Sequence, residues 1–337
     1  MADPTVLARV AARLGRRTGA VRRVLGGYSA AERFVVRWRE GGSAFVKAAT
    51  DADTAGWLRA EHAIYSRVHA PFMPALLGWE DDGANPWMAI EDLSSAEWPP
   101  PWSPARIAAV LATMREVAVT PHGGLESFDS RRAEFAGWPL VAREPEPFLR
   151  LGLATDRWLS RALPVLLDAE ARAKLDGDAL LHNDVRSDNL CFAGDRVVLV
   201  DWNWATRGNA RLDVAAWLPS LELEGGPAPE SILPDEPELA SFVAGFYAAH
   251  AGLPPPRPGM HELRALQLRM LRSSLAWASR ALGLPKPEGD AAGRACPPSL
   301  LASAPCPRNR CGRCHRSRSC SATRCSRRRC VTCRARS

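Results

Sequence analysis

Apolar and polar residues alternate over short stretches in the first third of the chain, and apolar residues recur every three or four positions over longer stretches further on. Alternation is typical of strands, whereas the longer spacing is typical of amphipathic helices. Turn-forming residues such as Gly-Gly and Asp-Gly separate the alternating stretches. We therefore expect strands at residues 21–28, 33–38, 43–50, 74–80 and 86–93, with one helix at 54–69.

The second part of the chain is dominated by helical spacing. Ser103 followed by Pro104 is a typical helix start, because serine caps the first turn and proline fits its first position. Two apolar runs around Gly194-Asp195 predict a hairpin in the middle of this part. The helices are expected at residues 103–119, 156–174, 238–250 and 261–282.

These elements predict an α+β fold with two lobes. Residues 1–93 are expected to form a small lobe with an antiparallel sheet, and residues 94–284 a mostly helical lobe. The composition then changes sharply, and residues 285–337 are expected to form a disordered tail rich in Arg and Cys, because they contain almost nothing that could build a core.

The tail also carries most of the unusual composition. From residue 291 onward it has 12 arginines and no acid. Since the whole chain has a net charge of +7, the other 290 residues have a net charge of 7 − 12 = −5. Eight of the nine cysteines lie there, and the pairs Cys311/Cys314 and Cys330/Cys333 match a zinc spacing. A polyanion-binding segment and GC-rich DNA read out of frame are the other interpretations. The ninth cysteine, Cys191, is expected to be a small buried residue.

Membrane and secretory segments are not expected. No apolar stretch approaches the roughly 18 residues of a membrane span, and arginines interrupt the N-terminal segment too often for a secretory signal. A cytoplasmic protein with no membrane or nucleic acid partner is therefore predicted. The single cysteine outside the tail agrees with a reducing compartment.

The octapeptide HNDVRSDN, residues 182–189, carries the strongest chemical signal. Asn189 follows Asp184 by five residues, and Asp201 follows Asn189 by twelve across the predicted hairpin. Phosphoryl transfer needs a carboxylate that takes the proton of the acceptor hydroxyl, and oxygen ligands for Mg²⁺. We therefore assign Asp184 as general base and Asn189 and Asp201 as metal ligands. An ordinary turn aspartate is the alternative for Asp184.

Lys47 lies in the third predicted strand, and Glu61 lies fourteen residues later on the helix that follows. This order fits a lysine that binds the α- and β-phosphates of ATP and a glutamate that holds it as an ion pair. A surface lysine and a solvated glutamate are the alternatives.

Two further segments are assigned to ATP binding. The loop at Gly26 and Gly27 is expected to close over the phosphates through its backbone N–H groups, although a plain turn would have the same residues. Glu91 and Leu93, in the segment that leads out of the fifth strand, complete the expected nucleotide site.

Four residues near the octapeptide are expected to support it. His182 is expected to anchor the loop through hydrogen bonds, and Arg186 is a candidate for holding the transferred phosphoryl group. Asp188 and Asp213 are expected to brace the loops.

With HNDVRSDN, VDWNWA and this order of elements, the chain resembles the aminoglycoside phosphotransferase and choline kinase superfamily. The resemblance covers about residues 20–284. It implies a protein-kinase-like fold and ATP- and Mg²⁺-dependent phosphorylation of a hydroxyl group on a small molecule, with Asp184 as base and Asn189 and Asp201 as metal ligands.

The resemblance leaves the acceptor open. Asn183 stands where the aminoglycoside enzymes usually have glycine and the choline and ethanolamine kinases have asparagine. Trp202 and Asn203 replace the Phe-Gly of eukaryotic protein kinases, which argues against a protein substrate. An aminoglycoside-type antibiotic and an amino-alcohol are the two candidate acceptors.

A cluster of acids after the hairpin is a candidate for attracting a cationic acceptor, with a solvated loop as the alternative. Tryptophans could contact a quaternary ammonium group, but most are expected in the core. Outside catalysis, a nucleotide-binding regulator and a protein acting through its tail are the alternatives. The acids are Glu222, Glu224, Glu230, Asp235, Glu236 and Glu238.

Overall fold

The computed structural model describes residues 4–24, 29–256 and 260–288. The chain divides into two compact units, Met1–Arg294 and Ala295–Ser337, and every element described below lies in the first. The predicted zinc spacing at 311–333 lies outside the described residues, as does most of the predicted tail. No helix among the described residues is long and apolar enough to cross a membrane.

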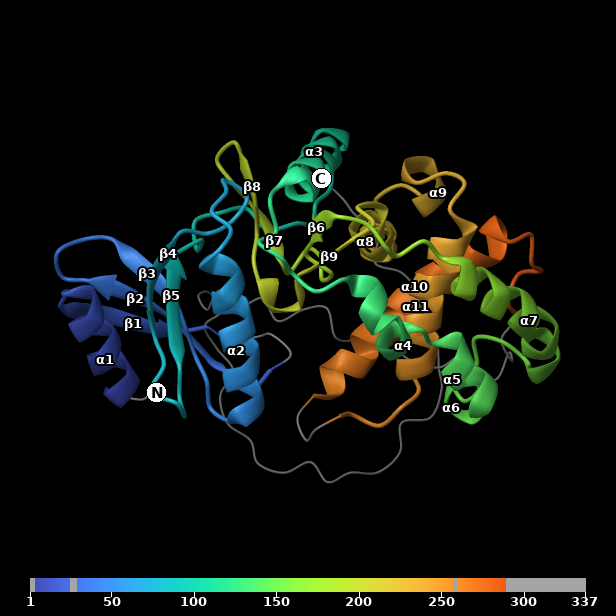
Figure 1. Ribbon diagram of the computed structural model, residues 1–337, viewed down its shortest axis with the longest axis horizontal. Helices are drawn as coiled ribbons and strands as arrows, with labels where there is room; N and C mark the ends of the chain where they lie inside the picture. Colours follow the sequence, from blue (N-terminus) through green and yellow to red (C-terminus); the bar gives the residue numbers. More distant parts are fainter. Residues whose placement is uncertain (1–3, 25–28, 257–259, 289–337) are drawn as a thin grey trace, which may run out of the picture. The chain divides into compact units, whose positions relative to one another are not determined.

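The first elements form a five-stranded sheet that is antiparallel throughout, with strand order β1-β2-β3-β5-β4. One helix precedes the sheet and a second connects β3 to β4 (Figure 1). Their bounds are α1 Pro4–Leu14, β1 Thr18–Arg23, β2 Glu32–Trp38, β3 Ser43–Ala48, α2 Ala52–Tyr65, β4 Leu76–Glu80 and β5 Trp87–Glu91.

The two helices cover opposite faces of this sheet, because successive side chains of a strand point to opposite sides (Figure 1). Val46 of β3 and Ala89 of β5 belong to an apolar cluster with the buried side of α1. Their neighbours Lys47 and Met88, which face each other across the β3–β5 pair, lie on the other face. Met88 packs in the large core with Leu58 of α2. The strand period therefore turns Lys47 toward α2.

The remaining elements are mostly helical, with two short antiparallel strand pairs, β6 with β9 and β7 with β8. Helices α7, α8, α10 and α11 pack on one another and share one apolar core (Figure 1). Their bounds are α3 Pro104–Val119, η1 Phe128–Arg131, α4 Arg132–Phe135, α5 Trp138–Arg143, α6 Glu146–Leu149, α7 Asp156–Arg172, β6 Ala179–Leu181, β7 Leu190–Ala193, β8 Arg196–Leu199, η2 Trp202–Trp204, β9 Thr206–Gly208, α8 Arg211–Leu223, α9 Pro229–Ile232, α10 Pro237–His250 and α11 His261–Ala281.

The α+β class, with a small antiparallel sheet and a mostly helical part, is confirmed, and the predicted strands and helices are found within a few residues of their expected bounds. Ser103 caps α3 as predicted, since its hydroxyl accepts from the backbone N–H of Arg106 while Pro104 begins the helix. The division into lobes at residues 93 and 94 remains a prediction.

Several elements were not predicted. Helix α1 lies in a segment considered only as a signal, and the helices between α3 and α7 have four to six residues each, which is too short for a period to be read. Helix α8 was also missed. Pro219 lies within it, and proline inside a helical pattern normally predicts an end.

Buried tryptophans account for much of the core, as expected. Cys191 is also completely buried, and burial raises the pKa of its thiol to about 12. Its interpretation as a small buried residue is confirmed. The tryptophans with essentially no exposed surface are Trp87, Trp138, Trp202, Trp217 and Trp277.

Candidate active site

The octapeptide forms the loop between β6 and β7, and Asp213 in the first turn of α8 holds its start. The carboxylate of Asp213 accepts hydrogen bonds from the backbone N–H groups of His182 and Asn183, at 2.7 Å each. Burial raises the pKa of Asp213 to about 6, although these two N–H groups favour its charged form. Asp213 therefore braces the loop from a separate helix, as predicted.

The His182 ring links the loop to the hairpin. Its Nε2 lies 2.8 Å from the carbonyl oxygen of Val200, and its Nδ1 lies 3.2 Å from the backbone nitrogen of Asp184. A carbonyl can only accept, so Nε2 carries the proton and Nδ1 accepts. Burial lowers the pKa of His182 to about 4, which keeps the ring neutral at pH 7. Its hydrogen bonds match the predicted anchoring role.

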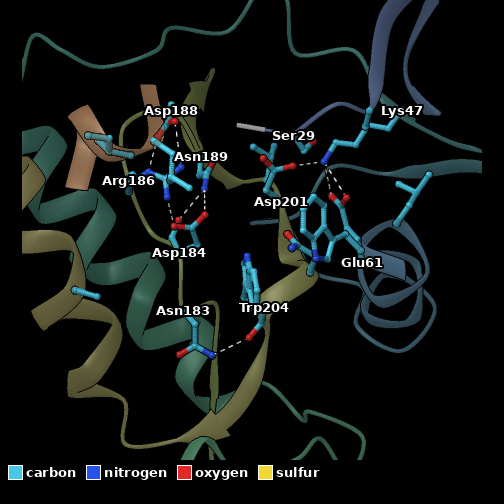
Figure 2. A pocket seen from close by; sticks show the side chains of 18 of the residues that line it. Ser29, Lys47, Glu61, Asn183, Asp184, Arg186, Asp188, Asn189, Asp201 and Trp204 are labelled. Carbon is cyan, nitrogen blue, oxygen red and sulfur yellow. Dashed lines mark hydrogen bonds and ion pairs between the residues drawn. The ribbon is translucent and has the colours of Figure 1, made fainter. Parts of the chain in front are cut away.

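Asn183 adopts a left-handed backbone conformation, with φ of 63°, which asparagine tolerates better than most residues. Its Nδ2 donates to the carbonyl oxygen of Trp204 at 2.9 Å and to the hydroxyl of Thr206 at 2.8 Å. Asn183 therefore fixes the turn that presents Asp184 (Figure 2).

The carboxylate of Asp184 is held from both sides. Asn189 Nδ2 donates to Asp184 Oδ2 at 2.8 Å and to its carbonyl oxygen at 2.9 Å, while Arg186 Nη1 pairs with Asp184 Oδ1. Arg186 also binds Asp188, with Nε 2.9 Å from Oδ1. Burial raises the pKa of Asp184 to about 6, although Arg186 favours its charged form. The four side chains form one group in Figure 2.

The β7–β8 hairpin returns Asp201 to the side of Asn189. Gly194 takes the positive φ of 62° in its turn, and the backbone N–H of Val200 donates to the carbonyl oxygen of Asn189 at 2.9 Å. Asp201 itself has a φ of 65°. The spacing of twelve residues thus brings the two predicted metal ligands to one place, as the hairpin prediction requires.

Lys47, Glu61 and Asp201 form one ionic cluster, in which Lys47 and Glu61 are buried. Lys47 Nζ lies 2.8 Å from both carboxylate oxygens of Glu61 and is paired with Asp201 as well. Lys47 and Glu61 are only 6% and 3% exposed, so the surface alternatives for both are wrong. Burial disfavours the charge of Lys47, but Asp201 and Glu61 outweigh it and raise its pKa. Burial raises the pKa of Glu61.

Of the other predicted ATP-site residues, Glu91 and Leu93 both line the same cavity as Lys47. The Glu91 carboxylate is bound to Arg196 of β8 at 2.6 Å, and Leu93 packs with Cys191. Gly26 and Gly27 lie outside the described residues.

The cavity has a volume of about 1090 Å³ and is lined from both the sheet and the helices. This exceeds the roughly 300–1,000 Å³ of a pocket for one small ligand. Besides Lys47 and Asp201, its lining includes Asp184, Arg186 and Asn189. The cavity therefore has room for two ligands that meet near Asp184 and Asp201.

Sequence reasoning missed the wall of the cavity beyond Asp184. Trp204 lies beside the loop of residues 182–189 in Figure 2, and Phe246 and Tyr247 of α10 line the same cavity. Burial raises the pKa of Tyr247, the charge of Arg186 lowers it and that of Asp184 raises it further. The apolar face of α10 was visible in the sequence, but nothing distinguished its cavity side from its core side.

The acidic cluster predicted as an attractor of cations does not line the cavity. Glu230 pairs with Arg280 at 2.5 Å, Glu236 pairs with Arg211 at 2.5 Å, and the other acids also lie outside the lining. The alternative interpretation, a surface segment, fits these contacts.

Comparisons with known proteins place this architecture in a known class. The profile of the phosphotransferase enzyme family (APH) matches residues 20–233. A choline/ethanolamine kinase family protein from Mesorhizobium loti shares the fold with a TM-score of 0.54 at 16% identity, over 83% of this chain and 97% of that one. A comparison with curated proteins found no match.

Two further solved structures have lower TM-scores. The amicoumacin kinase hAmiN, in complex with AMP-PNP, Ca²⁺ and Ami, gives 0.48 at 12% identity, over 81% of this chain and 93% of that one. Macrolide 2'-phosphotransferase type I gives 0.47 at 16% identity, over 84% of this chain and 93% of that one.

The family profile defines a phosphotransferase enzyme, and the solved structure shows the same fold. The chain belongs to the phosphotransferase enzyme family, and the resemblance inferred from its motifs is confirmed.

Proposed function

We propose that this protein transfers the γ-phosphoryl group of ATP, with Mg²⁺, to a hydroxyl group of a small molecule. The observation that carries the proposal is the convergence of four polar residues on one cavity. Lys47 and Asp201, which are separated by 154 positions in the chain, pair directly, and Asp184 and Asn189 lie on the adjoining loop. A purely structural role would not need buried charges from so many elements at one cavity wall.

Asp184 is proposed as the general base. Asn189 and Arg186 hold its two carboxylate oxygens, which fixes the direction in which it meets an acceptor hydroxyl. It would orient that hydroxyl and accept its proton as the bond to phosphorus forms. Lys47, held by Glu61, would bind the α- and β-phosphates, while Glu91 and Leu93 line the part of the cavity assigned to the rest of the nucleotide.

Asn189 and Asp201 fit a magnesium ion in the chemistry of their donors. The Nδ2 protons of Asn189 are committed to Asp184, so its Oδ1 is the atom left for a cation, and Asp201 adds a carboxylate. Mg²⁺ is usually held by one or two such protein oxygens together with phosphate oxygens and water. Bound there, the ion would neutralise charge on the phosphates of ATP.

The chemical class of the acceptor is a separate proposal. An aminoglycoside-type hydroxyl compound and a choline- or ethanolamine-like amino-alcohol are the two classes that the motif favours. Asn183 supports neither of them, because its hydrogen bonds serve the turn of the loop.

The test is Asp184→Asn, assayed for phosphoryl transfer from labelled ATP to aminoglycosides, choline, ethanolamine, sugars and uncharged alcohols. We expect the rate to fall by roughly 10² to 10⁴, as for loss of a general base. Asp195→Asn, at the exposed tip of the same hairpin, is the matched control and should leave the rate unchanged. Wild-type turnover in the Asp184 variant would refute the role of this residue. Stabilisation by ATP without any phosphorylated acceptor would favour a nucleotide-binding regulator.

A further inference from the structure

Aromatic and aliphatic side chains form the wall of the cavity beyond Asp184. Phe135 and Phe246 stack with ring centroids 5.8 Å apart, and Phe246 contacts Tyr247 edge to face at 5.2 Å. Trp204, on the segment that follows Asp201, is linked to this group through Arg131, whose guanidinium lies over both the Phe135 and the Trp204 rings. Leucine and phenylalanine residues from α8, α10 and α11 complete the wall: Leu212, Phe242, Leu263 and Leu266.

Three carboxylates near this wall are already paired with arginines. Glu134 is bound by Arg131 at 2.8 Å, and Asp188 is bound by Arg186 at 2.9 Å. Arg186 also pairs with Asp184. A polycationic acceptor would need carboxylates of its own to replace the water it loses on binding. Glu134, Asp184 and Asp188 already hold a cation, and the last two share the same arginine.

Two of the aromatic rings already have a cation over their faces. The guanidinium of Arg131 lies over the Phe135 ring at 5.3 Å and over the Trp204 ring at 5.9 Å from their centroids. These ring faces are where a cationic ligand would be attracted. Arg131 therefore occupies the cation–π positions and adds a like charge that would repel such a ligand.

Building on the proposed phosphoryl transfer, we propose that the acceptor is an uncharged alcohol with a large apolar body. The apolar body packs against Phe246, Tyr247 and Trp204, and the hydroxyl reaches Asp184. Its proton passes to the carboxylate of Asp184 as its oxygen forms the bond to the γ-phosphorus of ATP, and ADP leaves. Arg131 with Glu134 acts as a specificity determinant that excludes cations.

Isosteric pairs of acceptors isolate the effect of charge. Neohexyl alcohol differs from choline by a tert-butyl group in place of the trimethylammonium group, and 7,7-dimethyloctan-1-ol is the matching longer probe against hydroxyhexyltrimethylammonium. With the full-length protein and Mg-ATP, we expect kcat/KM for each neutral alcohol to exceed that of its cationic partner at least tenfold. Kanamycin, as a polycation, should be a poor acceptor. An equal or reversed preference would overturn the proposal.

A variant of Arg131 tests its proposed role in excluding cations. Arg131→Gln leaves Glu134 without its cation and uncovers the rings, so the ratio of cationic to neutral kcat/KM should rise about tenfold, within the range of a desolvated cation–π contact. Arg150→Gln removes the same charge from an exposed position outside the cavity and should leave the ratio unchanged. Equal ratios in wild type and Arg131→Gln would contradict the role of Arg131.

Binding separates this inference from the proposed reaction. Dissociation constants of the same four alcohols, measured by tryptophan fluorescence with AMP-PNP and Mg²⁺ present, need no turnover. Tighter binding of the neutral alcohols supports the inference even if Asp184→Asn retains activity, in which case only the proposed mechanism fails. If the cations bind as tightly, or if neither neutral alcohol binds, the inference fails while the loss of activity in Asp184→Asn still supports phosphoryl transfer.

Discussion

Glu170 in α7 should make the stability of this protein fall as the pH rises. Its side chain is almost completely buried, and Oε1 accepts the backbone N–H of Gly137 at 2.8 Å while Oε2 accepts that of Trp138 at 3.2 Å. It thereby caps the start of α5 from a neighbouring helix. Burial raises the pKa of Glu170 from its ordinary value of 4.5 to about 7, although these two N–H groups favour the charged form.

The sign and size follow from linkage. Below pH 4.5 the carboxyl is protonated in both the folded and the unfolded protein, so it contributes no pH dependence there. Between pH 4.5 and 7 the unfolded chain releases the proton more readily, and the free energy of unfolding falls. At 1.36 kcal/mol for each pKa unit, a change from 4.5 to about 7 corresponds to roughly 3 kcal/mol of lost stability above pH 7.

Glu170→Gln removes the titration while keeping an oxygen for the N–H of Gly137. Urea unfolding at pH 5 and pH 8 should show the variant near wild-type stability at pH 5 and more stable than wild type by up to about 3 kcal/mol at pH 8. Glu116→Gln, at an exposed position of α3, is the control for a change of net charge. The reasoning is refuted if wild type and Glu170→Gln lose the same stability between the two pH values.

Three further outcomes are expected. In Gly245→Ala the new Cβ would lie 2.3 Å from Oε1 of Glu170, so thermal or urea unfolding should show a loss of about 2–4 kcal/mol. Gly56→Ala, whose Cβ meets nothing within 4 Å, should instead add about 0.5–1 kcal/mol, and similar effects of both changes would contradict the close approach. Glu61→Gln should lower kcat/KM for ATP at least about tenfold in steady-state kinetics, because Lys47 loses its charged partner in a buried ion pair. An unchanged kcat/KM would contradict the role of this pair. Chelation by EDTA should abolish phosphoryl transfer, and Mg²⁺ should restore it, whereas full activity in EDTA would exclude the proposed ion.

The nucleotide side of the site was predictable because its residues are linked by local rules. A turn of known type returns Asp201 to Asn189, and the alternation along β3 turns Lys47 toward the helix that carries Glu61. Each rule needs only a few neighbouring residues. Their pairing across the cavity still had to be observed, since it joins segments far apart in the chain.

The acceptor side was not predictable for the opposite reason. A helical pattern in α10 shows that Phe242 and Phe246 lie on an apolar face, but not whether that face meets a core or a cavity. Likewise, the sequence shows that the residues near position 230 are acidic, but not which basic residues they pair with. Arg280, which binds Glu230, lies 50 residues further along the chain. Neutralisation of this kind depends on tertiary packing alone.

The charged side chains of the site have ionic partners within the protein before any substrate is considered, but the partners differ between the two halves of the cavity. Lys47 pairs with Asp201, and these are the groups assigned to phosphate and to Mg²⁺, so binding of Mg-ATP would exchange one set of ionic partners for another. Arg131 and Glu134 are assigned to neither phosphate nor Mg²⁺, and the Arg131 guanidinium of this pair lies over an aromatic ring. A charged acceptor would have to break that pair without a replacement. If cations are excluded as proposed, we expect selection of the acceptor to depend on shape and apolar area, at about 25 cal/mol for each Å² removed from water.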